Sequence, residues 1–281
     1  MKTPELRVFI IGAGKVGTSL SRALRARGAK VTLRAARSGL PARRIAADLL
    51  ILAVRDGQLE PLARALVAAN LVGRQTAVVH CAGALGPEPL APLRASASGV
   101  AQMHPMISFA SPRGVPTLER GQVNIDGDPA AVRVARRVAR LLGMTPRTLP
   151  NLDKIAYHAA AGLVANGAAA LAAAGVRLLG EGGVDAATAS KMLGPLLKSV
   201  GDNVESLGLP AALTGPVRRG DAAAVGRHLE VIRSRTPELV PLYLELISAQ
   251  LPMARKIGDA DPAAFAAVES LLGPPGRKRV D

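Results

Sequence analysis

Short apolar runs alternate with amphipathic segments over the first 150 residues of the sequence. The runs have the length of buried β-strands, and they lie at residues 6–11, 30–34, 49–54, 76–81, 99–103, 122–125 and 144–149. Between them, stretches such as "AVRVARRVARLLG" at 131–143 carry apolar residues at helical spacing. This alternation is typical of βαβ units. It predicts an α/β fold with a doubly wound, mostly parallel sheet of the Rossmann type.

The pattern changes near Pro150. The run at 151–180 is rich in alanine, and its small residues suit close packing between helices. No strand pattern follows it. Further helical patterns lie near residues 185–205, 221–233, 237–250 and 261–272. We therefore expect three parts, which are a sheet domain over 1–150, an all-α domain over 151–273 and a polar, disordered tail over 274–281.

The composition is that of a folded globular chain. Apolar residues make up 49% of the 281 residues, which is enough for cores in two domains. No apolar run reaches the ~18 residues typical of a membrane span, and the start "MKTPELRVFII" lacks a signal-peptide pattern. The single cysteine, Cys81, fits a reducing compartment, so we expect a cytoplasmic protein. Four scattered histidines give no zinc-binding spacing, so no metal site is expected.

The net charge of +15 comes almost wholly from the first domain. Residues 1–150 hold 22 Lys and Arg against 8 Asp and Glu, a balance of +14, which leaves +1 for the rest. Such a surface can steer a polyanion, including a nucleotide cofactor or nucleic acid. The arginines are dispersed, however, and we interpret most of them as solvated helix faces. With no Trp, two Tyr and three Phe, the chain offers few aromatic platforms for single-stranded nucleic acid.

Gly12, Gly14 and Gly17 form a G-x-G-x-x-G motif where the first strand ends and the first helix begins. In the dinucleotide-binding fold, the first glycine allows a tight turn and the second lets the backbone approach the pyrophosphate. The third lets helix and strand pack closely. The N–H groups at the start of the helix, here at Lys15 and Val16, are free to bind phosphate. Because a second strand follows at the right distance, we predict a dinucleotide site rather than a purely structural turn.

The second strand indicates which dinucleotide binds. An NAD-binding protein usually carries Asp or Glu about 20 residues beyond the glycines, where it bonds the ribose hydroxyls. The sequence instead has Arg34, Arg37 and Ser38 there, with no acid before Asp48. A carboxylate would repel a 2′-phosphate, whereas arginine can bind it with two hydrogen bonds. We therefore predict NADP(H) as the cofactor; the alternative is that these arginines are merely exposed.

Three later strand ends meet at the same edge of the predicted sheet, which is where open α/β sheets bind their ligands. Ala53, Val54 and Arg55 should run beneath the nicotinamide half of the cofactor, and Gly83 follows in "HCAGALG". The polar residues at these ends are His80, His104 and Ser108. For either histidine, the sequence leaves a structural and a chemical role equally open.

The order of these motifs resembles the superfamily of β-hydroxyacid dehydrogenases and pyrroline-5-carboxylate reductases. More closely, the chain resembles a bacterial family of Rossmann-like NADP-binding proteins with a helical C-terminal domain of unknown function. That family includes an alternative type of ketopantoate reductase. The segments that carry the resemblance are "GAGKVG", "HCAGALG", "HPMISF", "YHAAAGLVAN" and "LTGPVRRGD". The resemblance spans nearly the whole chain and implies a second domain like the C-terminal domain of 6-phosphogluconate dehydrogenase.

The resemblance also implies catalytic residues. β-Hydroxyacid dehydrogenases carry a catalytic lysine on the first long helix of the second domain, an asparagine four residues later, and a serine that binds the substrate carboxylate. Lys154 and Ser108 match the lysine and the serine, whereas His158 stands in place of the asparagine. On a helix, positions 154 and 158 lie about 40° apart and Asn166 about 80° beyond, so all three can border one cleft.

Either Lys154 or His158 could donate a proton to a carbonyl oxygen as hydride arrives at carbon. The alternative is that Lys154 is solvent-exposed and that His158 is a core histidine. In "LTGPVRRGD", Asp221 is placed to cap the following helix, while Thr214 and Arg219 are free to face a ligand. A comparable threonine-bearing loop reaches the substrate in pyrroline-5-carboxylate reductases.

These features predict an NADPH-dependent reductase of a small anionic 2-oxo acid that resembles ketopantoate. Ser108, Asn166 and Thr214 would orient the substrate. The alternatives are a reductase of a cyclic imine and a non-catalytic NADP-binding sensor or scaffold. Small residues on the Ala-rich helices, together with the resemblance, imply a homodimer through the second domain. No motif points to a specific nucleic acid or to a membrane as partner.

Overall fold

A computed structural model of the protein describes residues 6–114 and 116–273. The described chain forms two compact units that divide between Ala165 and Asn166. The predicted boundary at Pro150 lies in the connection before the first long helix, whereas the units divide inside that helix. The predicted tail at 274–281 lies outside the described residues.

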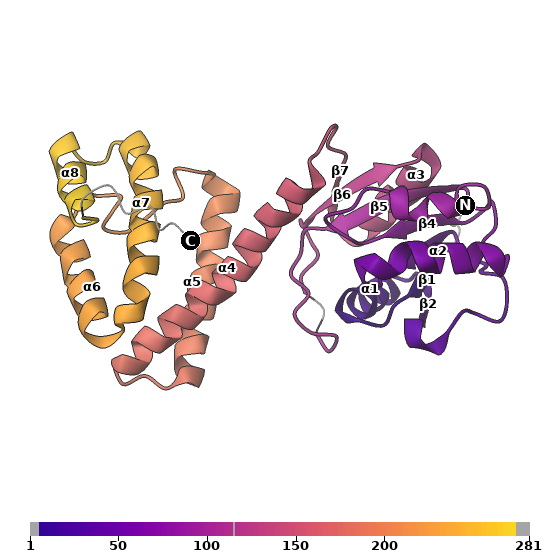
Figure 1. The fold of residues 1–281 in the computed structure, drawn as a ribbon, viewed down its shortest axis with the longest axis horizontal. Helices are drawn as coiled ribbons and strands as arrows, with labels where there is room; N and C mark the ends of the chain where they lie inside the picture. Colours follow the sequence, from indigo (N-terminus) through magenta and orange to yellow (C-terminus); the bar gives the residue numbers. More distant parts are fainter. Residues whose placement is uncertain (1–5, 115, 274–281) are drawn as a thin grey trace. The chain divides into compact units, whose positions relative to one another are not determined.

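The first unit holds a seven-stranded sheet (Figure 1), and every pair of neighbouring strands in it is parallel except one. Along the sheet the strands are β2 Lys30–Arg34, β1 Arg7–Ile11, β3 Leu49–Leu52, β4 Ala77–His80, β5 Gly99–Pro105, β6 Gln122–Gly127 and β7 Thr145–Arg147. β6 pairs antiparallel with β5, because the chain between them returns without a crossover helix. All seven predicted strands are present. The predicted doubly wound, mostly parallel sheet is therefore confirmed.

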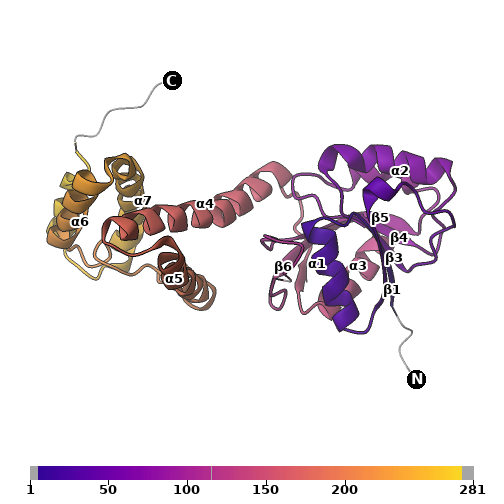
Figure 2. The same cartoon turned by 90° about the horizontal axis from the view of Figure 1, so that it is seen from below.

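Helices cover both faces of this sheet. α1 Lys15–Ala26 and α3 Pro129–Leu141 pack on one face, where Leu20, Leu24 and Val138 are fully buried. α2 Leu59–Ala68 and the 3₁₀ segment η3 Glu88–Leu93 pack on the other (Figure 2). The central strands β3 and β4 are buried at every position, since both of their faces lie under helices. This explains why their residues, except His80 at the end of β4, are apolar instead of alternating between apolar and polar.

The second unit is helical. Its elements after the first long helix are α5 Ala186–Leu207, α6 Ala222–Arg235, η4 Pro237–Leu239, α7 Val240–Ile257 and α8 Pro262–Ser270. Val225, Leu229, Leu251 and Phe265 form its buried core. Asp221 caps α6 by accepting a hydrogen bond from the N–H of Ala224 at 2.9 Å, as the sequence predicts.

The first long helix, α4 Lys154–Glu181, has no buried residue. Several of its apolar side chains are exposed, among them Leu163 at 77% and Val164 at 71%. Among the described residues it is the one helix whose length and mean hydropathy of 1.6 would suit a membrane span. This is weak evidence for a membrane, because an apolar helix that packs against another protein surface meets the same criteria.

Candidate functional site

The glycine loop has the backbone geometry that a dinucleotide site requires. Gly12 has φ +119°, and a Cβ there would lie 2.2 Å from the carbonyl oxygen of Ala53. A Cβ on Gly17 would lie 1.9 Å from the carbonyl oxygen of Gly12. These two glycines are therefore required for packing between the loop, β3 and α1.

Gly14 differs from its two neighbours in the motif. A Cβ built on it meets nothing within 4 Å, so the space beside it is open to a ligand. Gly14 is the N-cap of α1, no side chain caps this helix, and its first turn contains no acidic residue. The free N–H groups and the positive end of the helix dipole therefore face open space, which suits a phosphate.

The three polar residues predicted at the end of the second strand, Arg34 in β2 and Arg37 and Ser38 after it, have different surroundings. The guanidinium of Arg34 donates to the carbonyl oxygens of Ser38, Gly39 and Leu40, at 2.5, 2.8 and 3.0 Å. Arg37 and Ser38 are exposed, and no hydrogen bond or ion pair joins the Arg37 side chain to another residue that the structure describes. Arg34 is thus engaged with its own chain, while Arg37 is free to bind an anion.

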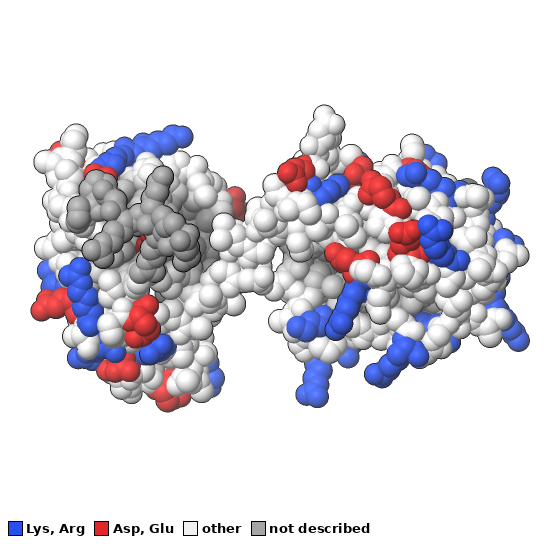
Figure 3. Space-filling view, viewed as in Figure 1, with Lys and Arg blue, Asp and Glu red and all other residues white. Residues whose placement is uncertain are grey.

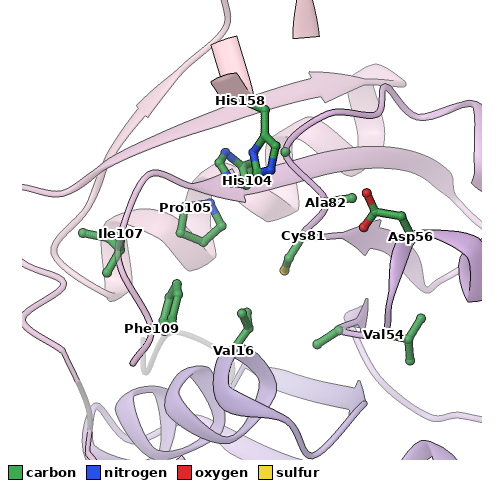
Figure 4. A pocket seen from close by; sticks show the side chains of 12 residues that line it. Val16, Val54, Asp56, Cys81, Ala82, His104, Pro105, Ile107, Phe109 and His158 are labelled. Carbon is green, nitrogen blue, oxygen red and sulfur yellow. The ribbon is translucent and has the colours of Figure 1, made fainter. Parts of the chain in front are cut away.

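A cavity of about 360 Å³ opens at the carboxyl ends of the central strands (Figure 4). Most of its lining residues are apolar or small, and they are joined by two imidazoles and one carboxylate. The lining residues are Val16, Ala53, Val54, Asp56, Cys81, Ala82, Gly83, His104, Pro105, Ile107, Phe109 and His158. Five of the predicted site residues are therefore brought together in one place, namely Val16, Ala53, Val54, Gly83 and His158. The predicted neighbours Lys15 and Arg55 are exposed nearby and do not line the cavity.

Two histidines lie side by side at one wall of the cavity (Figure 4). The ring centroids of His104 and His158 are 5.8 Å apart, with the rings nearly perpendicular. Nδ1 of His104 is 3.1 Å from the hydroxyl of Tyr157. Burial, and after it the neighbouring His158, lowers the pKa of His104 to about 4. His104 is therefore uncharged at neutral pH.

His80 has a structural role. The N–H of Ala82 donates to its Nδ1 at 3.1 Å, so the proton is on Nε2, which donates to the carbonyl oxygen of Gly86 at 2.7 Å. Its side chain is fully buried, and this burial lowers its pKa. The neutral ring holds the chain after β4 in shape. That segment carries Gly83 into the cavity wall.

Lys154 is held away from the cavity. Its Nζ lies 3.0 Å from Oε1 of Gln102 and 2.9 Å from Oδ2 of Asp126, and its side chain is only 15% exposed. Gln102 is fully buried and also donates through Nε2 to the carbonyl oxygen of Ala82 at 2.8 Å. Asn124 donates to the same Oε1 of Gln102 at 3.0 Å. This network ties the first turn of α4 to the sheet.

The network residues Gln102, Asn124 and Asp126 were missed by the sequence analysis. The available signal was the occurrence of polar residues inside the buried strands "GVAQMHP" and "QVNIDG". A buried amide needs hydrogen-bond partners, and so it points to a polar neighbour from another element. The sequence analysis also did not predict that the carboxylate of Asp56 lines the cavity.

The remaining predicted residues do not line the cavity. Ser108 is exposed in the loop after β5, between Ile107 and Phe109, which do line it. Asn166 is exposed on α4, and Thr214 is exposed in the turn before α6. Both of these belong to the second unit. No group of His, Cys, Asp and Glu within the described ranges is arranged to hold a metal ion.

Two family models match the sequence. A Rossmann-like domain matches residues 39–105, and a domain of unknown function, DUF2520, matches residues 122–250. The chain thus joins a Rossmann-like domain to a DUF2520 domain, in agreement with the predicted resemblance. No protein of curated function matches the sequence.

Solved structures share the fold over most of the chain. A candidate NADP oxidoreductase from Bacteroides fragilis is 19% identical, with 88% of this chain and 98% of that chain covered and a TM-score of 0.66. A protein from Thermotoga maritima is 22% identical, with coverages of 89% and 98% and a TM-score of 0.62.

A pyrroline carboxylate reductase from Plasmodium falciparum, solved with NADP bound, is 11% identical, with coverages of 94% and 100% and a TM-score of 0.57. At these identities the likeness shows the fold alone. That fold is the one used by NAD(P)-dependent oxidoreductases.

Proposed function

We propose that the protein is an NADP(H)-dependent reductase that transfers hydride to a small C=O or C=N compound. The observation that carries this proposal is the cavity at the strand ends. It places two imidazoles beside the carboxyl ends of β4 and β5, next to a glycine loop with an uncapped helix. Open α/β sheets bind their ligands at this edge, and the structural neighbours are consistent with a reductase.

The residues present fit the dinucleotide. The open side of Gly14 and the free N–H groups of Lys15 and Val16 would hold the pyrophosphate. The exposed side chains of Arg37 and Ser38 would bind a 2′-phosphate, which favours NADP(H) over NAD(H). When bound, the nicotinamide supplies the hydride.

We assign the proton donor to His158 rather than Lys154. His158 lines the cavity, whereas the ammonium group of Lys154 is bonded to Gln102 and Asp126. An imidazolium N–H can donate to the oxygen or nitrogen of the substrate as negative charge develops there. His104 is uncharged, so it can accept a hydrogen bond in this site without adding a second positive charge.

By resemblance, the first candidate substrate is a 2-oxo acid like ketopantoate, with Ser108 as the residue proposed to bind its carboxylate. One observation favours the second candidate, an imine. Asp56 lines the cavity, and among the described residues no Lys or Arg does. A carboxylate attracts a protonated iminium and repels a carboxylate substrate. Asn166 and Thr214, in the second unit, remain predictions from the sequence.

We further propose that the protein is a cytoplasmic homodimer. Leu163 and Val164 on α4, and Met192, Leu196 and Leu207 on α5, are all more than half exposed. Soluble monomers rarely expose apolar surface of this extent, and a second copy of the same helices would cover it. On the face of the sheet unit that Figure 3 shows, Lys and Arg side chains project singly and do not gather into one patch, which favours cofactor steering over specific nucleic-acid binding.

The test has two stages. In a thermal-shift screen, NADPH should raise the melting temperature more than NADH does, and duplex DNA should have no effect at moderate salt. A panel of 2-oxo acids and cyclic imines is then followed by NADPH absorbance. Turnover of an oxo acid or an imine selects between the two candidates. Binding of NADPH without turnover of any member would instead favour the non-catalytic sensor.

A further inference from the structure

The chain after β2 makes a tight turn around a single side chain. Residues Ala36–Ser38 form a 3₁₀ turn, and the following carbonyl groups of Ser38, Gly39 and Leu40 all point at Arg34. Nε donates to Gly39, and Nη2 donates to both Ser38 and Leu40. Bonds from a guanidinium are charge-assisted and roughly twice as strong as neutral ones. Three of them hold this turn closed.

Glycine makes this convergence possible. Gly39 has φ +68° and ψ −171°, a backbone conformation that residues other than glycine rarely adopt. A Cβ on Gly39 would meet nothing within 4 Å, so glycine is needed here for its backbone conformation and not for space. Without it, successive carbonyl groups could not turn toward one cation.

Arg34 is also joined to the glycine loop. Its own carbonyl oxygen accepts a hydrogen bond from the N–H of Gly12 at 2.8 Å. Arg34 pairs with Ile11 in the register of β1 and β2. The same residue therefore links the pyrophosphate loop to the turn that carries Arg37 and Ser38.

We propose that Arg34 is a positioning residue for cofactor choice, and that Arg37 and Ser38 are the groups that bind the 2′-phosphate. The guanidinium of Arg34 holds the 38–40 carbonyls, which fixes the turn and presents the two exposed side chains to the ligand. This inference rests on the proposed binding of NADP(H). It assigns different tasks in one site to two arginines that differ in their contacts, since the Arg34 side chain is bonded to its own chain and the Arg37 side chain is exposed.

The test compares Arg34→Gln with Arg37→Ala in the full-length protein. Hydrogen exchange of the amides at 36–40 is measured without cofactor, and the affinities for NADPH and NADH are measured by titration. Arg34→Gln should speed this exchange about 10-fold or more, since the turn loses its anchor. It should also weaken the binding of NADPH about 10-fold, while the affinity for NADH should stay within about 3-fold of that of the wild type. Arg37→Ala should weaken NADPH similarly and leave the exchange unchanged.

Two further variants make the result specific. Gly39→Ala keeps every arginine but strains the turn, so it should reproduce both effects of Arg34→Gln. Arg25→Gln is the matched control, because Arg25 is an exposed arginine that donates to the carbonyl oxygen of Val31 on the same strand. It should leave both the exchange and the affinities unchanged. If Arg34→Gln does not fold, Arg34→Lys retains the charge with fewer donors and should show the same changes at smaller size.

The double variant Arg34→Gln/Arg37→Ala separates positioning from direct contact. If Arg34 acts through Arg37, the double variant should lose barely more affinity for NADPH than Arg37→Ala loses alone. Additive losses, or unchanged exchange in Arg34→Gln while the wild type still prefers NADPH, would overturn the positioning role. Equal affinity of the wild type for NADPH and NADH would instead refute the proposed cofactor choice, together with the role that depends on it.

Discussion

Nδ1 of His158 lies against the backbone of Gly83. A Cβ built on Gly83 would be 2.3 Å from this nitrogen and 2.8 Å from Nε2 of His104. The chain after β4 thus passes directly beneath two imidazoles, one from β5 and one from α4. Gly83 is the residue that lets the rings approach the cavity wall, so its lack of a side chain is a requirement of the site.

The first prediction follows from this packing. Gly83→Ala should displace one or both imidazoles and lower kcat by about 10-fold or more, since a small displacement of a proton donor is costly. NADPH affinity should change less, because the pyrophosphate loop is untouched. Gly57→Ala is the control, since Gly57 lies in the turn after β3 and a Cβ there meets nothing within 4 Å. Equal activity of both variants would show that the rings do not depend on Gly83.

The second prediction separates Lys154 from His158. His158→Asn should lower kcat by about 10²–10⁴, the usual loss for a positioned proton donor. It should also remove the limb of the pH–rate profile that an imidazole produces. NADPH affinity should stay near wild type.

Lys154→Met is the companion variant. It removes the bonds to Gln102 and Asp126, so it should lower the free energy of unfolding by about 1–3 kcal/mol, the range for a buried polar group that loses its partner. Its effect on kcat should be smaller than that of His158→Asn. The reverse ranking, with kcat lost in Lys154→Met and kept in His158→Asn, would identify the lysine as the proton donor.

The third prediction concerns the stability of the folded protein at acidic pH. Burial lowers the pKa of His104 to about 4, below the 6.5 of an exposed histidine. Between these values the unfolded chain binds a proton that the folded protein does not, so stability falls as the pH drops from 6.5 toward 4. The loss should be on the order of 2–3 kcal/mol.

The melting temperature measured from pH 7 to pH 4.5 tests this. The melting temperature of His104→Gln should fall less steeply with decreasing pH than that of the wild type. Part of the fall should remain, because burial also lowers the pKa of His80. His228→Gln is the control, because His228 is exposed in the second unit and pairs only with Tyr243 among the described residues. An unchanged slope in His104→Gln would contradict the assignment.

The sheet could be predicted from the sequence because its signal is local. β3 is apolar at every position and β4 at every position before His80, which a run of four to six residues reveals directly, and the glycines at 12, 14 and 17 mark the turn that follows β1. His158 could be placed near a cleft from the resemblance of its helix to that of the β-hydroxyacid dehydrogenases, and helix periodicity agrees with that position. These features depend on neighbours within a few residues.

Contacts between elements could not be predicted in this way. Gln102 and Lys154 are 52 residues apart, and their bond exists only after α4 docks on the sheet. His80 and His104 could not be distinguished either, since both lie at strand ends. Arg34 carries a charge suited to a phosphate, but its side chain instead bonds the carbonyl groups around Gly39. The backbone conformation of Gly39 that allows this cannot be inferred from hydrophobic periodicity.

The exposed face of α4 leads to the last prediction. A stable interface between two copies buries roughly 800 Å² from each, and apolar residues at its centre carry most of the energy. Leu163 and Val164 are the most exposed large apolar side chains of this helix. A charge placed there would be buried without a partner if a second copy covers the face.

Leu163→Glu should therefore convert a dimer to a monomer, measured as a halving of mass in sedimentation equilibrium, while the circular dichroism spectrum stays that of a folded helical protein. Val67→Glu is the matched control, because Val67 is an apolar residue exposed at 39% on a different helix, α2. It should leave the mass of the dimer unchanged. A wild type that is monomeric at micromolar concentration would refute the dimer. Binding of that monomer to lipid vesicles, abolished by Leu163→Glu, would assign the apolar face of α4 to a membrane instead, since the helix is long enough to meet that requirement.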